Sequence, residues 1–161
     1  MLKEKQLERY ADVMLWGLTT ARTQRFKKND IVQVRFNLPA LRLAEMLHER
    51  LLERGLNPVM RFSSTPTMER DFFERAAPKQ LVFQPPGTDT LYERLNGSIF
   101  LHAPESITHL SGVDPKKIAR FTVAQKPLRE ILDKRDAAGL FGWTLCMLPT
   151  AELALLVWKM S

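Results

Sequence analysis

Apolar residues recur at every third or fourth position through the first twenty residues, and this spacing predicts an amphipathic helix. The apolar stripe of this helix comprises Leu7, Tyr10, Ala11, Met14 and Leu18. Charged residues such as Glu8 and Asp12 fall on the other side, where water solvates them. We expect the helix to end before a basic turn at residues 25–30.

Two short runs rich in β-branched and aromatic residues follow, and a second helical pattern separates them. The runs Ile31–Phe36 and 58–62 predict strands. Between them, Pro39 falls in the first turn of a helix, and Gly55 is placed to end that helix in the left-handed conformation. The apolar face of this helix comprises Ala40, Leu43, Ala44, Leu47 and Leu51. Because a helix connects the two strands, we expect them to be parallel with a right-handed crossover.

The segment 63–97 predicts an elaborated helical crossover. A loop at residues 63–65 leads to Pro66, where we expect a helix to begin. The apolar side of this helix comprises Met68, Phe72, Phe73 and Ala76. A weaker helical pattern follows at residues 79–84 and stops at the Pro-Pro-Gly sequence of residues 85–87.

One more short helix is predicted before the third strand. Thr90 and Glu93 stand three positions apart, which is the spacing of a capping box. Asn96 and Gly97 are typical of a turn, so we expect them to end this helix before a strand at residues 98–102.

The second half of the chain predicts a long helix followed by a buried strand. Asp114 can cap the helix and Pro115 can begin it. Its expected core face comprises Phe121, Ala124, Leu128, Ile131 and Leu132, and we expect Pro127 to kink or restart it. Gly139 and Gly142 end the helical period, and a fourth strand is expected at residues 143–148.

The order of these elements predicts an α/β fold with three layers. We expect a mostly parallel sheet of about four strands with helices on both faces, formed by a single domain over residues 1–161. The only cysteine, Cys146, falls inside the fourth strand, so a disulfide framework is excluded and a buried, inert thiol is expected. This free thiol predicts a reducing, cytoplasmic location. We expect a soluble protein, because the charged first helix argues against a signal peptide and no run is long enough to span a membrane.

The charge balance is basic, with 24 Lys and Arg against 18 Asp and Glu and a net charge of +6. Short basic runs such as residues 25–28 and 116–117 are separated by acidic residues. Proteins that bind a nucleic-acid backbone usually gather their cations on one face or along one helix. We therefore expect a solvated surface and no nucleic-acid partner, with a basic nucleic-acid-binding domain as the weakest alternative.

No catalytic, cofactor-binding or metal-binding residue can be assigned from the motifs. The three histidines are His48, His102 and His109, and none belongs to a His-Glu-x-x-His pair. The phosphate loop, the dinucleotide fingerprint and the nucleophile elbow are also absent from the sequence. Cys146 lacks the exposed, electropositive surroundings of a catalytic thiolate.

The carboxyl ends of the predicted strands remain as a candidate site, because open α/β sheets usually bind ligands there. Polar residues expected at this rim are Asn37, Ser63, Ser64, Thr65, Glu105 and Thr150. Loop and cap residues of these types are also common without any ligand. A small-molecule site at the rim is thus an open hypothesis.

Several stretches in order resemble the amino-terminal domain of the aminopeptidase T family of metalloaminopeptidases. These stretches are Leu-Glu-Arg-Tyr-Ala-Asp-Val-Met in the first helix, Leu-Arg-Leu-Ala-Glu-Met-Leu-His-Glu-Arg-Leu-Leu-Glu-Arg-Gly in the second, Met-Glu-Arg-Asp-Phe-Phe at residues 68–73, Leu-Ser-Gly-Val-Asp-Pro at 110–115, Trp-Thr at 143–144 and Pro-Thr at 149–150. The resemblance covers nearly all of the chain and rests on the order and spacing of these stretches.

The resemblance implies a domain without the catalytic centre. Members of that family are more than twice as long, and they hold two divalent metals with glutamate, histidine, tyrosine and aspartate ligands in a carboxyl-terminal domain. No position here matches that ligand motif, so no metal ligand can be carried over. The resemblance therefore implies a non-catalytic amino-terminal domain of a leucyl-type aminopeptidase. It implies the missing catalytic domain as a partner, peptide as the substrate of the parent enzyme, and a role in the substrate-chamber wall and in a homodimer.

A stand-alone α/β module that binds a small ligand or a protein at the strand-end rim is the competing hypothesis.

The end of the chain bears on the question of partners. Residues 153–158 are apolar at six successive positions, whereas a surface helix normally shows an apolar stripe on one side only. We expect either a terminal helix packed on the fourth strand or a docking surface that causes self-association through Leu156 and Trp158.

Overall fold

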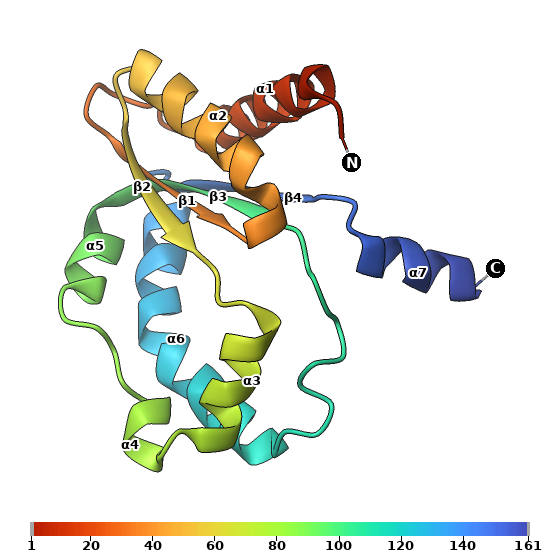
Figure 1. Cartoon of the computed structure of the whole chain (residues 1–161). Coiled ribbons are helices and arrows are strands. Elements are labelled where there is room, and N and C mark those ends of the chain that lie inside the picture. The colour runs from red at the N-terminus through yellow and green to blue at the C-terminus, as the bar shows by residue number, and fades with distance from the viewer. Residues whose placement is uncertain (1, 161) are drawn as a thin grey trace.

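The computed structural model describes residues 2–160, and the side chains of residues 156–160 lie outside that description. Its centre is a four-stranded sheet in the order β2-β1-β3-β4, in which every neighbouring pair is parallel. The strands are β1 (Ile31–Phe36), β2 (Asn57–Phe62), β3 (Leu95–His102) and β4 (Gly142–Met147). The predicted α/β fold, with a parallel sheet and helices on both faces, is confirmed (Figure 1).

Two helices, α1 (Glu4–Thr20) and α2 (Leu41–Glu53), cover the first face of the sheet (Figure 1). A short 3-10 turn at Leu38–Ala40 leads into α2, and Gly55 follows it with φ +71° as its position in the sequence predicts. The main core lies between these helices and the strands. Its completely buried strand residues are Val32, Val34, Ile99 and Leu101.

Four helices lie on the second face of the sheet: α3 (Pro66–Arg75), α4 (Pro78–Leu81), α5 (Thr88–Arg94) and α6 (Pro115–Ala137). They pack largely on one another around a second, smaller apolar cluster of Phe73, Ala76, Leu81 and Val113. Phe121 of α6 contacts Phe72 and Phe73 of α3 edge-on, with ring centroids 5.7 and 5.6 Å apart. Lys117 Nζ joins α6 to α3 by donating to the carbonyl oxygens of Phe73 and Glu74 at 2.8 and 2.9 Å.

The start of the third strand differs from the prediction. β3 begins at Leu95, so Asn96 and Gly97 lie inside the strand instead of ending a helix. The Asn96 side chain accepts a hydrogen bond from the Ile31 backbone at 2.9 Å, which fixes it against β1. Gly97 packs so closely on α1 that an added Cβ would lie 2.9 Å from Leu18 Cδ1. Turn-forming residues were thus placed in the strand by tertiary contacts.

The short helices also differ in detail. Gly87, with φ +82°, precedes α5, so Thr90 lies inside the helix and the predicted capping box with Glu93 is wrong. The pattern at 79–84 is helical only as far as Leu81, because Val82 leaves the helical conformation. Met68 is 55% exposed and takes no part in the apolar side assigned to it.

The long helix α6 begins as predicted, since the Asp114 side chain accepts a hydrogen bond from the Lys116 backbone and Pro115 occupies the first turn. It runs through Pro127 as one helix, so the predicted restart does not occur. Of its expected core face, only Leu128 is buried, and the other four residues are half-buried. The reason is that α6 faces a hollow under the sheet instead of a closed core.

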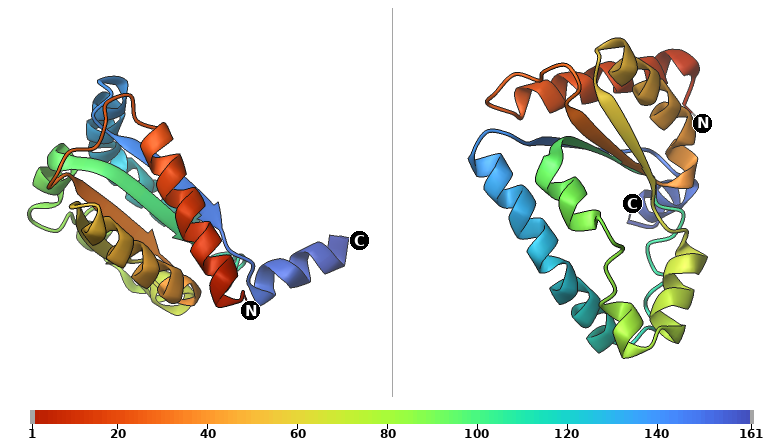
Figure 2. Two further views of the ribbon diagram at one scale, coloured as in Figure 1. Left: turned by 90° about the horizontal axis from the view of Figure 1, so that it is seen from above. Right: turned by 90° about the vertical axis from the view of Figure 1, so that its left-hand side faces the viewer.

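The last helix, α7 (Ala151–Met160), extends away from the rest of the domain in Figure 1 and in the left view of Figure 2. Thr150 caps it by accepting a hydrogen bond from the Leu153 backbone at 3.3 Å. Leu155 is 56% exposed. Leu156 and Trp158, named above for self-association, lie outside the described side chains. Among the described residues, no helix is long and apolar enough to cross a membrane.

Candidate binding site at the carboxyl ends of the strands

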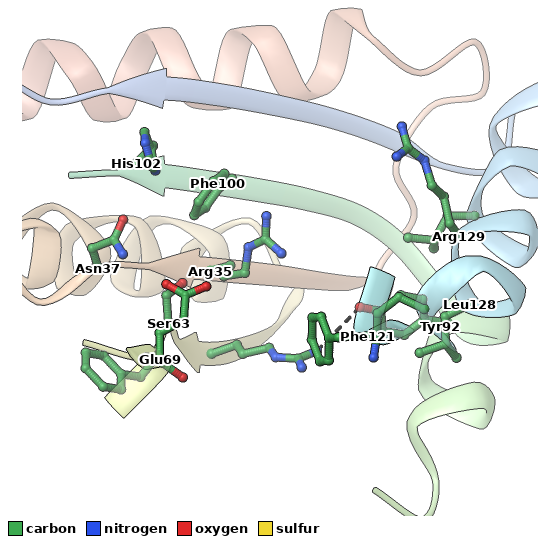
Figure 3. Close-up of a pocket in the computed structure, with 15 residues that line it drawn as sticks. Arg35, Asn37, Ser63, Glu69, Tyr92, Phe100, His102, Phe121, Leu128 and Arg129 are labelled. Atoms are coloured by element: carbon green, nitrogen blue, oxygen red, sulfur yellow. Dashed lines mark hydrogen bonds between the residues drawn. The ribbon is translucent and has the colours of Figure 1, made fainter. Parts of the chain in front are cut away.

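A hollow of about 680 Å³ lies between the second face of the sheet and the helices α3 and α6. Strand residues Arg35, Arg61 and Phe100 form its roof, and helix residues such as Phe121 and Leu128 form its opposite side (Figure 3). This volume is in the range of pockets that bind small ligands. The hollow is therefore the principal candidate site of the described chain.

Strand alternation places the roof residues in a row. Arg35 of β1 is the register partner of Arg61 on β2 and of Phe100 on β3. Register partners in a parallel sheet point to the same face, and neighbouring strands are roughly 4.8 Å apart. Val34 and Ile99, the residues directly before Arg35 and Phe100, point to the first face and are completely buried. Burial on one face thus fixes two neighbouring arginines and an aromatic ring on the other.

The guanidinium of Arg35 is held against the ring of Phe100, with its central carbon 4.0 Å from the ring centroid (Figure 3). This is a cation–π contact that keeps the charged group at one place in the hollow. Burial lowers the pKa of Arg35 from its ordinary value, the nearby Tyr92 raises it, and the like charge of Arg61 lowers it further. The group remains charged at neutral pH, because arginine deprotonates only in strong alkali.

Arg61 is oriented by a tyrosine. Its Nη1 donates to the hydroxyl oxygen of Tyr92 on α5, at 3.4 Å, which Figure 3 marks with a dashed line. A third arginine, Arg129 of α6, also lines the hollow. Within the described part of the chain, none of these three arginines forms an ion pair.

The only acidic residue that lines the hollow, in the range 2–160, is Glu69. Its Oε2 lies 2.8 Å from Nε2 of His109, so this carboxylate pairs with a histidine and, among the described residues, forms no ion pair with the three arginines. The hollow as a whole is therefore cationic. Such a site attracts an anion, and the planar fork of an arginine matches a carboxylate or a phosphate particularly well.

Five of the six predicted rim residues line one of two hollows, and the sixth lines neither. Asn37, Ser63 and Ser64 line the cationic hollow, and Asn37 also accepts a hydrogen bond from the Ala103 backbone at 2.9 Å. Glu105 and Thr150 line a second hollow of about 550 Å³ between the first turns of α1, α2 and α7. Thr65 instead caps α3, accepting a hydrogen bond from the Met68 backbone at 3.2 Å.

The hollow owes its character to Arg35, Arg61 and Phe100, which were not predicted as site residues from the sequence. A signal for them exists in the sequence. Arg35 and Arg61 each stand one position before the last residue of a predicted strand, a place where a charged residue must point away from the apolar core. Their pairing needed the register between the strands, which the sequence alone did not supply.

The histidines and the cysteine are not brought together. His48 lies on α2, His102 ends β3 and lines the cationic hollow, and His109 contacts Glu69. Cys146 is buried as expected, and burial raises the pKa of its thiol to about 11. In the part of the chain that the structure describes, no three His, Cys, Asp or Glu side chains are placed to hold a metal ion.

The chain is thus an α/β domain with a parallel sheet and a cationic hollow at the carboxyl ends of its strands, where open sheets of this kind usually bind ligands. The chain belongs to the M29 family of thermophilic metalloproteases, which matches residues 3–161. The expected resemblance to metallopeptidases is thereby confirmed, and the protein is related to metal-dependent proteases.

Among solved structures, wild-type AmpT from Thermus thermophilus has a similar fold, with a TM-score of 0.64 and 16% sequence identity. The likeness covers 91% of this chain and 36% of the AmpT chain, so this chain spans only about a third of that protein's length. Comparison with curated protein sequences gives no match.

Proposed function

We propose that this chain is the non-catalytic amino-terminal domain of a metal-dependent leucyl aminopeptidase, an enzyme that removes amino acids from the amino ends of peptides. In this proposal it contributes to the wall of the substrate chamber and to assembly. The observation that carries the proposal is how much of this chain, and how little of AmpT, the matches cover. The M29 family matches residues 3–161, and the AmpT likeness covers nearly all of this chain but 36% of AmpT. The buried free thiol of Cys146 is consistent with a cytoplasmic location.

The donor groups in this chain do not fit the metal pair of a two-metal peptidase. Such a centre needs carboxylates that bridge two ions roughly 3.5–4 Å apart. Glu69 and His109 form the one acid–histidine contact among the described ion pairs, and no third donor joins them. We therefore place the metal pair in a carboxyl-terminal catalytic domain, which is the partner that this proposal requires.

Activity measurements test the proposal directly. The 161-residue chain is expected to release no product from leucyl substrates with added cobalt, zinc or manganese, and to bind no metal tightly. The product of the complete reading frame that encodes these residues is expected to hydrolyse the same substrates. A metal-dependent turnover by the short chain that survives purification contradicts the non-catalytic role. A reading frame that closes at Ser161 contradicts the role as a domain of a longer enzyme.

Assembly is tested by light scattering over a range of concentrations. The apolar segment 153–158 motivates the expectation of concentration-dependent self-association, reduced by Leu156→Glu or Trp158→Glu. Leu155→Glu is a further variant, because the Leu155 side chain is described and 56% exposed. A monomer at high concentration, unchanged by all three substitutions, contradicts the homodimer through this helix.

A stand-alone ligand-binding module is the second candidate function. The cationic hollow with its row of Arg35, Arg61 and Phe100 favours it, because such a site binds without any catalytic domain. The two candidates differ in what the complete reading frame encodes. If the chain is a stand-alone module, the 161-residue chain binds its ligand by itself, and the reading frame encodes no larger protein that acts on peptides.

A further inference from the structure

We propose that the cationic hollow binds the carboxylate of a short peptide, with the carboxylate between Arg35 and Arg61 and an apolar side chain against Phe121 and Leu128. The choice of a peptide as the occupant rests on the proposed function, whereas the anion site rests on the geometry alone. The arginine row is not explained by the packing of the sheet, and its place in a hollow gives it access to a ligand.

The placing of two arginines side by side has an energetic cost. Two like charges on directly neighbouring strand positions repel each other, and such pairs destabilise a sheet. Arg35 and Arg61 are register partners, and within residues 2–160 neither forms an ion pair. An anion placed between them removes this repulsion, so its binding energy includes the relief of that cost.

Both arginines are held in position before a ligand binds. The ring of Phe100 holds the Arg35 guanidinium at 4.0 Å, and the Tyr92 hydroxyl contacts Arg61 at 3.4 Å. Neither contact uses up the hydrogen-bonding capacity of a guanidinium, which has five N–H donors. Groups held in place before binding lose less conformational entropy when the ligand arrives.

The rest of the hollow has room and side chains for the remainder of the peptide. The wall opposite the strand arginines carries the apolar side chains of Phe121, Leu128 and Leu132 of α6, beside the polar Gln125 and Arg129. A hollow of about 680 Å³ has room for a molecule of the size of a di- or tripeptide. The strand arginines and the apolar side chains that face them match a peptide that ends in a carboxylate and carries an apolar residue. A bare phosphate would leave these apolar side chains of α6 without a partner.

The test compares three probes on the 161-residue chain by calorimetry and amide NMR shifts: leucyl-phenylalanine, its carboxyl-terminal amide, and inorganic phosphate. We expect the free dipeptide to bind and the amide to bind about 10- to 100-fold more weakly, because a charge-assisted hydrogen-bond pair is lost. When the free dipeptide binds, we expect the amide signals of Phe100 and Leu128 to shift.

Variants sharpen the same test. Arg61→Gln and Arg35→Gln are each expected to weaken dipeptide binding about 10- to 100-fold, and Arg61→Lys by less. Arg25→Gln is the matched control, since Arg25 is exposed in the loop before β1, at the opposite end of the strands. Arg61→Gln is expected to unfold at the same or a slightly higher temperature than the parent, which shows that a loss of binding is not a loss of folding.

The outcomes separate the two proposals. Equal binding of dipeptide and amide, or equal effects of Arg25→Gln and Arg61→Gln, overturns the carboxylate site. Phosphate binding as tight as that of the dipeptide overturns the peptide as its ligand. Absence of binding by all three probes overturns the site itself. None of these results depends on aminopeptidase activity, so the proposed function fails or stands in its own assay.

Discussion

The two faces of the sheet differ in what covers them. On the first face, α1 and α2 pack against residues such as Val34 and Leu101, which are completely buried. On the second face, α3 to α6 pack mostly on one another, and a hollow lies beneath the strands (Figure 3). The difference teaches that one alternating strand pattern can support a closed core and an open binding surface at once.

The edge strand β4 shows the contrast most clearly. Cys146 points to the first face and is buried, whereas Trp143, Leu145 and Met147 point to the second face and are 57, 48 and 53% exposed. The two sets alternate along six residues of one strand. We therefore expect stability to depend mainly on the first face and binding to depend on the second.

The largest expected effect comes from truncating a residue of the closed face. Leu101→Ala removes a fully buried side chain, so it is expected to lower the free energy of unfolding by about 2–5 kcal/mol. Leu145→Ala on the neighbouring strand is the matched control and is expected to cost less than about 1 kcal/mol, because Leu145 is half exposed already. Urea denaturation measures both, and equal losses would contradict the division between the faces.

The next effect depends on pH. Burial raises the Cys146 pKa to about 11 from an ordinary value of 9.0, so the folded chain holds the proton more tightly than the unfolded chain. The contribution of the thiol is therefore fully present below about pH 9 and is lost as pH rises toward 11, by up to about 2–3 kcal/mol.

The measurement for Cys146 is a comparison of the parent chain with Cys146→Ala by urea denaturation at pH 8 and at pH 10.5. Other groups titrate in the same range, and the variant retains them all. We expect the parent to lose more stability than the variant between the two pH values. An identical loss in both proteins would mean that the closed face does not shield the thiol.

The smallest effect concerns the tie between two helices of the second face. Lys117→Met removes the donor to the carbonyl oxygens of Phe73 and Glu74, so we expect a loss of about 1–2 kcal/mol. Hydrogen exchange is expected to become faster in α3 than in α2. Lys116→Met is the control, since Lys116 is exposed and its side chain has no partner among the described residues. Equal exchange in both variants would show that Lys117 does not hold the helices together.

The fold was predictable from the sequence wherever the local residue pattern was clear. Short runs rich in β-branched and aromatic residues located the four strands, and Asp114 with Pro115 placed the start of α6. Predictions failed where tertiary contacts outweighed local preference, as at Gly97, which lies inside β3 because α1 packs closely against it. The cationic hollow escaped prediction because Arg35 and Arg61 are 26 positions apart and meet only through the register of two strands.

The placing of neighbouring residues of β1 on opposite faces of the sheet has a consequence for how this protein can change over evolutionary time. Residues that set the fold and residues that set the charge of the hollow occupy separate positions, such as Val34 and Arg35, although they are adjacent in the chain. Exchanges at Arg35 and Arg61 can therefore alter the chemistry of the hollow without disturbing the core. The fold thus leaves its ligand preference open to stepwise divergence through a few surface positions.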